Sequence, residues 1–479
     1  MDLRDASLAD LLERTVRRVT HLGARRRRDT GRIACSFETI EAPVSAGIAG
    51  KPEGTRPRLR LLIRLLEPAC FGTAPVPDNF IPTECFMRGQ LVLGAFANWA
   101  LAHSRPADDL MPSRGAMVFG VGLPMPEEPA SGALGAWEVM PIPLDMRIPK
   151  PAAQRRSHWP YWAEDASPVT DAAAPATEQQ ESEESARMAK LKRPGPREFL
   201  FRSAPTDPWQ RYSVPVSRHM RNNAGEARRR NEPKSALYTR EELLEDTAFL
   251  VDLTFSSTAI AEDFVDRFGE VLTGCGWLTV GRGSAPAMVT QAAFLKPSGR
   301  QALPAGATNF RLTLLSDLVA RGPRLGFLDT IDAPALAGLA GKGADVVARI
   351  VTEAETDTET VHGFNASSGQ PRLAVPCVRR GSVITCRSDD EAALRSLYDA
   401  LRPLEALGER QSEGFGAFRL DAAPPVIAKR PPAPVEPSPQ VTAIEARLAR
   451  ARAVTDALGA VARERRGDGD RLDFPARSQ

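Results

Sequence analysis

The order of its strand and helix patterns limits what this chain can fold into more than any other feature. Short alternating apolar runs predict strands, and apolar residues at helical spacing predict a helix between them. The order strand, helix, strand, strand opens a ferredoxin-like βαββαβ unit. We therefore expect an α+β fold whose first ferredoxin-like module spans residues 58–162. Its expected elements are a strand at 58–66, a helix at 83–103 capped by Thr83, and strands at 116–123 and 136–144.

A second series of the same kind follows and predicts a second ferredoxin-like module over residues 199–421. It begins with a strong apolar strand, AFLVDLTF, and it ends with a glycine-rich segment before a last strand. Its expected strands are 248–255, 277–280, 287–294 and 310–319, with a hairpin of 373–378 and 382–387 around Arg380-Gly381, and its expected helices are 258–273 and 390–402.

Segments of different composition separate and flank the two modules. Residues 163–198 are expected to be a disordered acidic insert, because they are rich in Ala, Glu, Ser, Thr and Gln and poor in large apolar residues. Residues 422–440 form a Pro-rich linker. Before the first module, 1–57 combine an amphipathic helix with a basic linker. After the second, 441–479 form an amphipathic helix and tail.

Charge and cysteine usage narrow the functional classes. The 62 basic and 60 acidic residues give a net charge of only +2, so the clustering of arginines is more informative than their number. Arginine forks suit phosphates and base edges, which favours nucleic acid over a membrane as partner. No apolar run can span a bilayer, and the six cysteines form no CxxC pair. We expect buried thiols in a reducing compartment, the cytoplasm, with no metal and no cofactor.

The segment GERQSEGFGAF (408–418) is the most informative motif. Gly414 and Gly416 bracket Phe415, and glycines let a backbone approach a phosphate closely and present its amides to it. Arg410 can add a charge-assisted hydrogen bond. The alternative interpretation is a tight connection from a helix to a strand.

The segment SRHMRNNAGEARRR (217–230) is a second candidate for RNA contact. Its central glycine and asparagines predict a loop, and a basic loop can clamp a single strand electrostatically. The alternative is a solvated loop without a partner. The candidate residues in it are Arg218, His219, Arg221, Arg228, Arg229 and Arg230, and candidate platforms for base stacking are Tyr212, Phe364, Trp159 and, as the preferred one, Phe415.

Taken in order, these segments resemble the CRISPR-associated RAMP superfamily, and within it the large RAMP subunit of type III-D effector complexes. Those that carry the resemblance are PTECFMRGQL (82–91), VMPIPLDMR (139–147), VSRHMRNNAGEARRR (216–230), LTLLSDLV (312–319), HGFNASSGQPR with VRRGSVI (362–384), and the Gly-Glu-Arg start and Glu-Gly-Phe-Gly end of 408–416. GRGSAPAMV (281–289) resembles a family loop that is usually more basic, because Ala285, Pro286 and Ala287 stand in it.

The resemblance implies a non-catalytic RNA-binding subunit of a type III effector complex in antiviral defence. It would bind guide RNA (crRNA), at the 5′ repeat-derived handle, beside other RAMP and large subunits, and it would meet target RNA only indirectly. It adds Arg88, Arg282, Arg379 and Arg380 to the expected RNA contacts.

Two other functions remain open. A RAMP endoribonuclease that processes precursor guide RNA would need an acid/base pair, and only His219 and His362 are placed for it. We expect neither to be catalytic. A structural subunit that mainly bridges other proteins is the other possibility.

Overall fold

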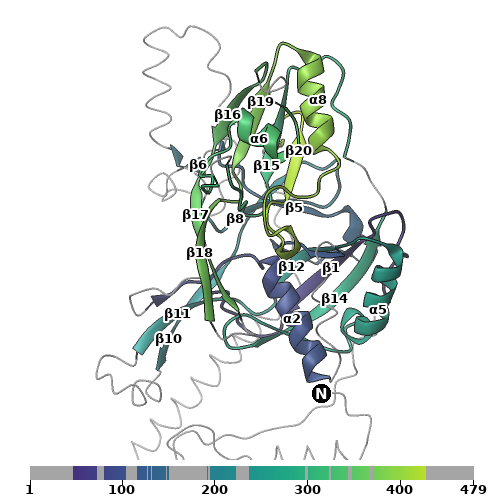
Figure 1. Ribbon diagram of the computed structural model, residues 1–479. Coiled ribbons are helices and arrows are strands. Elements are labelled where there is room, and N and C mark those ends of the chain that lie inside the picture. The colour runs from purple at the N-terminus through teal and green to yellow at the C-terminus, as the bar shows by residue number, and fades with distance from the viewer. Residues whose placement is uncertain are drawn as a thin grey trace, which may run out of the picture. The chain divides into compact units, whose positions relative to one another are not determined.

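The computed structural model divides the chain into two units, of residues 1–427 and 428–479. All the residues that it describes belong to the first unit (Figure 1). The N-terminal helix expected within 1–57, the C-terminal helix and most of the acidic insert lie outside the described residues. The end of the insert, predicted to be disordered through 198, is described at 191–192 and 195–198, where it forms a short strand and the start of another. The described ranges are 47–72, 80–103, 116–126, 128–130, 132–146, 148–149, 191–192, 195–222, 237–296, 300–322, 325–343, 348–365 and 370–427.

The first sheet is built around strand β1 (Arg58–Leu65), which lies between two strands that begin 190 and 227 residues later in the chain. All its pairings are antiparallel, and the order is β13-β14-β1-β12-β3, with β4 also pairing with β12. Helix α2 follows β1 in the chain, and α5 follows β12. This is the strand order of a ferredoxin-like unit. The bounds are β3 (Met117–Phe119), β4 (Leu123–Met125), β12 (Ala248–Phe255), β13 (Leu278–Val280), β14 (Ala285–Leu295), α2 (Gly89–Ala102) and α5 (Thr258–Leu272).

The two helices cover one face of this sheet (Figure 1). The Phe96 ring of α2 lies 5.3 Å from the Phe264 ring and 5.2 Å from the Phe268 ring of α5, measured between centroids. α2 begins at Gly89 and not at Thr83, so that expectation is wrong. The Thr83 hydroxyl instead accepts a hydrogen bond from the Phe71 amide at 2.9 Å, which holds the preceding loop.

The second sheet repeats the same plan with different strands. Its order is β16-β19-β15-β20, with α6 after β15 and α8 after β19, so it is a second ferredoxin-like unit. The predicted fold class, α+β with two ferredoxin-like modules, is therefore confirmed. The bounds are β15 (Asn309–Leu314), α6 (Ala333–Leu339), β16 (Val351–Glu355), β19 (Val383–Arg387), α8 (Glu391–Leu401) and β20 (Phe418–Asp421).

The predicted boundary between the modules is wrong. Strands β12 to β14 were expected in the second module, but they complete the first sheet on both sides of β1. The reason is the burial of β1, whose Leu59, Leu61 and Leu62 are fully covered. A strand that is buried on both faces needs a partner at each edge, and the next strands of this sheet in the chain, β3 and β4, pair with β12 instead.

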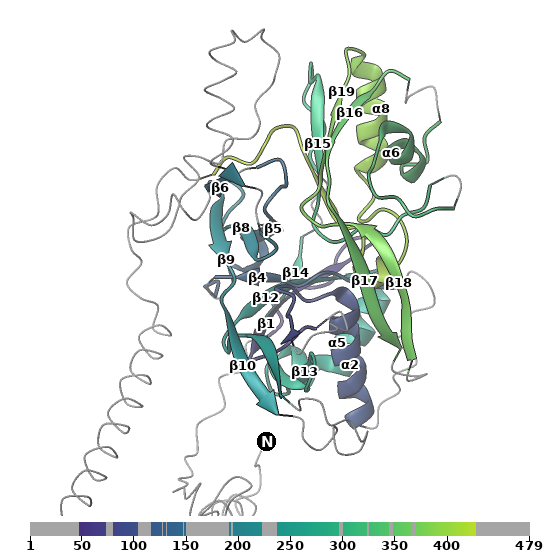
Figure 2. The same cartoon turned by 90° about the vertical axis from the view of Figure 1, so that its left-hand side faces the viewer.

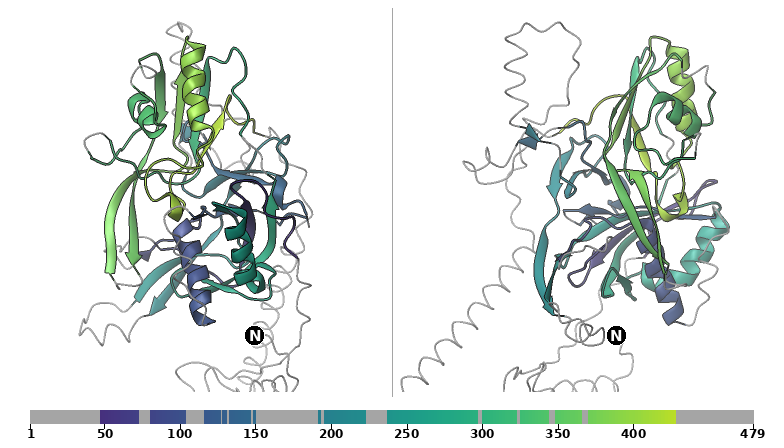
Figure 3. Two further views of the ribbon diagram at one scale, coloured as in Figure 1. Left: turned by 45° about the vertical axis from the view of Figure 1, so that its right-hand side comes forward. Right: turned by 60° about the vertical axis from the view of Figure 1, so that its left-hand side comes forward.

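Each module carries an insertion between its second and third strands (Figures 2 and 3). In the first, it includes β5 (Glu138–Pro141), β6 (Ile148–Pro149), β7 (Leu191–Lys192), β8 (Glu198–Arg202), β9 (Gln210–Ser213), and the first ribbon, β10 (Val216–Asn222) with β11 (Leu237–Leu243), which pairs with β2 (Phe80–Ile81). In the second, it is the second ribbon, β17 (Thr358–Asn365) with β18 (Gln370–Val378).

The hairpin predicted around Arg380-Gly381 is therefore wrong in its pairing. β18 pairs with β17, whereas β19 pairs with β15 and β16. The turn carries the chain from one sheet to the other, and it is fixed by the Gly381 carbonyl, which accepts from the Leu144 amide at 2.8 Å.

Four of the five described cysteines are buried, and all five are free thiols. Burial raises the pKa of Cys386 to about 12, so that thiol stays protonated. Cys275 is exposed, contrary to expectation. In the described part of the chain, no helix is both long and apolar enough to cross a membrane.

Candidate nucleic-acid interface

The first ribbon holds arginines on one face through a buried carboxylate. Glu241 on β11 is only 2% exposed, and its Oε1 accepts from Arg197 at 2.5 Å and from Arg218 at 3.3 Å. The Arg218 guanidinium also lies over the Phe80 ring of β2, 5.4 Å from its centroid. One carboxylate thus orients two arginines, and this face keeps an excess positive charge.

The next residue of β11 does the same on the opposite face, since neighbouring residues of a strand point to opposite sides. Glu242, 1% exposed, pairs with Arg240 through an Nε–Oε1 distance of 2.5 Å and lies 3.6 Å from Nε2 of His219. Arg240 in turn donates to the carbonyl of Arg282 at 3.4 Å. The loop between β13 and β14 is thereby brought beside the ribbon.

Three sequence-predicted residues therefore lie at the first ribbon, Arg218 on one face and His219 with Arg282 on the other, and each is accessible. The Arg218 side chain is 65% exposed, the His219 side chain is 50% exposed, and Arg282 is exposed at the tip of its turn. Within the described part of the chain, no carboxylate forms an ion pair with Arg282. Arginines that are held but not neutralised suit phosphates, because the guanidinium fork can donate two hydrogen bonds to one anion.

The glycine-rich segment uses its amides inside the protein. The Gly414 amide donates to the Gln411 carbonyl and the Gly416 amide to the Asp317 carbonyl, each at 2.9 Å. A Cβ on Gly414 would lie 2.6 Å from the Phe119 carbonyl oxygen, so glycine is required for close packing against the first module. Contact between these amides and a phosphate stays a prediction, and the structure supplies the alternative reason for both glycines.

A buried charge cluster lies beside that segment and joins the two modules. Arg88, at the N-cap of α2, donates from Nε to Glu84 at 2.9 Å and pairs through an NH group with Asp317 at 2.9 Å. Asp317 also accepts from the Arg380 amide at 3.0 Å. Burial opposes the charge of Asp317, but Arg88 and Arg380 outweigh it and lower its pKa.

Aromatic rings close this cluster. The Arg380 guanidinium lies 3.8 Å from the centroid of the Phe86 ring. Phe415, the preferred stacking platform, is 3% exposed and packs with Val361 and Cys377. Arg410 lies over that ring at 4.6 Å and pairs with Glu413 at 2.6 Å. As the chain stands, Phe415 is a core residue, and its contact with RNA stays a prediction.

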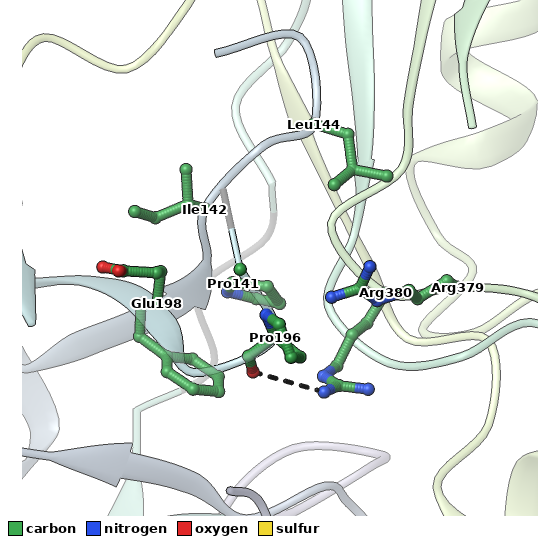
Figure 4. Close-up of a pocket in the computed structure, with 9 residues that line it drawn as sticks. Pro141, Ile142, Leu144, Pro196, Glu198, Arg379 and Arg380 are labelled. Atoms are coloured by element: carbon green, nitrogen blue, oxygen red, sulfur yellow. Dashed lines mark hydrogen bonds between the residues drawn. The ribbon is translucent and has the colours of Figure 1, made fainter. Parts of the chain in front are cut away.

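The turn that carries Arg379 and Arg380 lines a small pocket together with Pro141 and Pro196 (Figure 4). Arg380 donates to the Pro196 carbonyl at 3.4 Å, and Arg379 pairs with Asp357 at 2.8 Å. Both arginines thus have partners within the protein.

The predicted site residues fall into three groups. Some lie on the surface at the first ribbon, some lie in or beside the buried cluster, and the rest cannot be placed by their side chains. The surface group is Arg218, His219 and Arg282; the second is Arg88, Arg379, Arg380, Arg410, Gly414, Phe415 and Gly416; the side chains of Arg221, Arg228, Arg229, Arg230, Phe364 and Trp159 lie outside the described residues. Tyr212 is half-buried, and this burial raises its pKa to about 12.

Sequence reasoning missed the residues that orient the surface arginines. These are Glu241 and Glu242, together with Arg197 and Arg240. The sequence signal for them was the pair of adjacent glutamates in the strand pattern TREEL. Neighbouring residues of a strand point to opposite faces, so each carboxylate, if buried, needs a cation on its own face. Among the described residues, no group of three or more His, Cys, Asp or Glu side chains could hold a metal ion.

No protein-family model matches this chain, and a search of the curated proteins found no match. Among solved structures, the chain is similar to a chain of the Type III-B Cmr-beta complex bound to cognate target RNA and AMPPnP, with 11% identity over 72% of this chain and 88% of that one and a TM-score of 0.32. It is also similar to Cas6 of Thermus thermophilus, with 9% identity over 76% and 98% and a TM-score of 0.31. The fold assignment rests on the strand order and not on these likenesses.

Proposed function

We propose that this protein is a non-catalytic RNA-binding subunit of a CRISPR effector complex of type III, III-D-like in its motifs. It binds guide RNA at the 5′ repeat-derived handle, acts in the cytoplasm, and assembles with other RAMP and large subunits. The observation that carries the proposal is that the first ribbon exposes Arg218 on one face and His219 on the other, where Arg240 holds Arg282 alongside from a segment more than 60 positions away.

Two features make single-stranded RNA the best fit to the first ribbon. Arg218 is held by the buried Glu241, so less side-chain entropy is lost when a phosphate binds than for a free arginine. The Arg218 guanidinium also lies over the Phe80 ring, and its side chain is 65% exposed, so it is accessible to an unstacked base.

The test is RNA binding by the full-length chain, measured by fluorescence anisotropy with repeat RNA at several salt concentrations. The double variant Arg218→Gln with Arg282→Gln should weaken binding. It should also reduce the log–log salt slope by roughly 1.4, since each phosphate contact contributes roughly 0.7.

The matched control removes two exposed charges from the second module, by Arg349→Gln with Arg402→Gln. These side chains are 67% and 43% exposed. The control should bind like the natural chain. Equal losses of RNA affinity in both double variants would mean that binding depends only on the total charge of the chain. Absence of RNA binding, even with partner subunits present, would refute the proposal.

An endoribonuclease is the second candidate. His219 supports it, because its Nε2 lies 2.9 Å from the Ser217 hydroxyl and 3.6 Å from Glu242. We rank it lower, since a histidine held in this way also serves as a hydrogen-bonding contact to RNA.

A further inference from the structure

The junction of the two modules holds three carboxylates against two guanidinium groups. The guanidinium groups belong to Arg88, at the N-cap of α2, and to Arg380, in the turn between β18 and β19. Both side chains are buried, with 8% and 5% exposed. The carboxylates are those of Glu84, Asp317 and Glu359. When all three are ionised, negative charges exceed positive charges by one in this group of five residues, which we call the joint.

Two of the three carboxylates are well compensated. Asp317 pairs with Arg88 at 2.9 Å and with the Arg380 guanidinium at 3.5 Å, and it accepts a hydrogen bond from the Arg380 amide at 3.0 Å. Glu359 pairs with Arg380 at 3.5 Å, and its side chain is 37% exposed, so water solvates its charge as well. The excess negative charge of the joint therefore falls on the third carboxylate.

Glu84 has the weakest support for a negative charge. Its side chain is 10% exposed, and in the described part of the chain its carboxylate accepts hydrogen bonds only from Arg88, which it shares with Asp317. Burial raises the pKa of Glu84 to about 7 against the opposing effect of Arg88 and Arg380, and Asp317 adds to the rise. Of the three carboxylates, Glu84 is therefore the one that takes up a proton first as the pH falls.

The neighbouring thiols do not compete for that proton. Burial raises the pKa of the Cys85 thiol to about 11 and that of the Cys377 thiol to about 12, so both are protonated already at neutral pH. Glu241, which acts on Cys85 from β11, has its own ion pair with Arg197 at 2.5 Å. Near neutral pH, a change of charge in the joint is thus a change at Glu84.

The joint fixes a turn of the second module against the first module. The Arg380 guanidinium lies 3.8 Å from the centroid of the Phe86 ring and donates to the Pro196 carbonyl at 3.4 Å (Figure 4). The adjacent Gly381 carbonyl accepts from the Leu144 amide at 2.8 Å. Phe86, Leu144 and Pro196 all belong to the first module, so a rearrangement of these charges changes the contact between the modules.

We propose that the joint is a pH-sensitive contact between the two modules, which is held closed while Glu84 carries a proton and opens more often as Glu84 ionises. The direction follows from proton linkage. In an open joint, water reaches Glu84 and its pKa returns toward the ordinary value near 4.3, so opening releases a proton. The stabilisation by this proton is complete below the ordinary pKa and is lost as the pH rises to about 7. RNA binding plays no part in this inference.

Hydrogen–deuterium exchange of the full chain at pH 5.5, 6.5 and 7.5 measures the opening. After correction for intrinsic exchange rates, protection of the peptide that contains Leu144 should fall by up to about tenfold per pH unit and level off above about pH 7. Glu84→Gln carries no titrating proton, so its protection should be the same at all three pH values. In both chains this peptide should be less protected than β12, because the joint opens without unfolding of the first sheet.

The matched control is Glu353→Gln, which removes a carboxylate that is 61% exposed on β16 of the second module. It should keep the pH dependence of the natural chain. The inference is overturned if the natural chain shows no pH dependence at Leu144, if Glu84→Gln keeps that dependence, or if Leu144 and β12 are equally protected. Should Glu84→Gln fail to fold, NMR titration of the natural chain with ¹³C-labelled glutamate decides. One carboxyl should titrate near pH 7, and the absence of any that titrates above pH 6 overturns the inference.

Discussion

At the scale of single residues, Asp317 shows what holds the two modules together. It is 2% exposed, yet it meets Arg88 of the first module and both the amide and the guanidinium of Arg380 of the second. A buried carboxylate without such partners would be strongly unfavourable. Arg88 and Arg380 therefore have a structural task that is independent of RNA.

Asp317→Asn should destabilise the protein strongly, because it leaves two buried guanidinium groups without their shared anion. We expect a loss of about 3–5 kcal/mol in the free energy of unfolding, the usual cost of breaking a buried pair. Urea unfolding at pH 7 measures it. Glu353→Gln, which breaks an exposed pair with Arg387, should change it by about 1 kcal/mol or less.

The same carboxylate predicts the direction of the acid response. Its pKa in the folded state lies below that of an unfolded Asp, near 3.9. The unfolded chain therefore binds more protons as the pH falls. The stability that Asp317 contributes is present above about pH 4 and is lost as the pH falls through the folded pKa. Between pH 5 and pH 2, the free energy of unfolding should fall more steeply with decreasing pH for the natural chain than for Asp317→Asn. Equal pH dependences would contradict this assignment.

The two histidines give the prediction that separates binding from catalysis. His219 to Ala together with His362 to Ala should leave guide-RNA maturation intact in a reconstituted system, because we assign no proton transfer to either. RNA affinity should fall moderately through His219 alone. If maturation stops in the double variant while RNA still binds, the endoribonuclease is the correct function.

At the scale of elements, helix α2 depends on how closely the glycine-rich segment approaches its first turn. A Cβ on Gly89 would lie 2.0 Å from the Phe119 carbonyl oxygen and 2.5 Å from that of Glu413. Both atoms belong to backbone, so neither can rotate away. Gly89→Ala should therefore separate the helix from this segment and destabilise the chain by several kcal/mol, measured by thermal or urea unfolding.

Gly94→Ala in the same helix is the matched control. A Cβ there meets nothing within 4 Å, and alanine favours helix by roughly 1 kcal/mol over glycine. It should stabilise slightly or have no effect. Similar losses in both variants would show that helix propensity, and not close approach, explains Gly89.

The elements also show how far the sequence could predict this fold. The strand at 248–255 and the helix beginning at 258 were predicted with the bounds observed or within one residue, because apolar periodicity is a local signal. The pairing of β18 with β17 was not predicted. Two strand patterns separated by a short turn predict a hairpin, but they do not determine which strand each one pairs with. Helix α6 was missed as well, since its small, Ala-rich sequence has little periodicity.

The candidate site was predictable only in part, for a similar reason. Exposed arginines such as Arg218 stand out in a sequence. The burial of Arg88 and Phe415 depends on contacts between modules that lie hundreds of residues apart, which no local pattern records.

At the scale of the whole molecule, the described unit ends later than the Pro-rich composition suggests. The Trp209 amide donates to the Val426 carbonyl at 2.9 Å, and Ile427 packs on the cluster that includes Trp209. A truncation that tests the tail should therefore follow Ile427, and not the start of the Pro-rich linker predicted at 422.

Truncation after Ile427 should leave a soluble, folded chain with weakened assembly into the effector complex. The sequence predicts a helix with an apolar stripe over 441–465. An isolated helix of this length has little stability in water, so we expect its apolar face to pack against a partner subunit. Copurification of partner subunits and the melting temperature measure the two effects. Normal assembly would exclude docking by the tail, and insolubility would mean that the tail covers this chain's own core.

The place of β1 at the centre of the first sheet has a consequence for synthesis on the ribosome. Leu61 pairs with Val251 on one side and with Ala292 on the other, so both neighbours emerge long after β1 itself. Until then, a strongly apolar strand has two open edges and must be kept from pairing with other chains. A nascent chain that stops before residue 295 cannot close this sheet, and we expect such fragments to need chaperones and to aggregate without them.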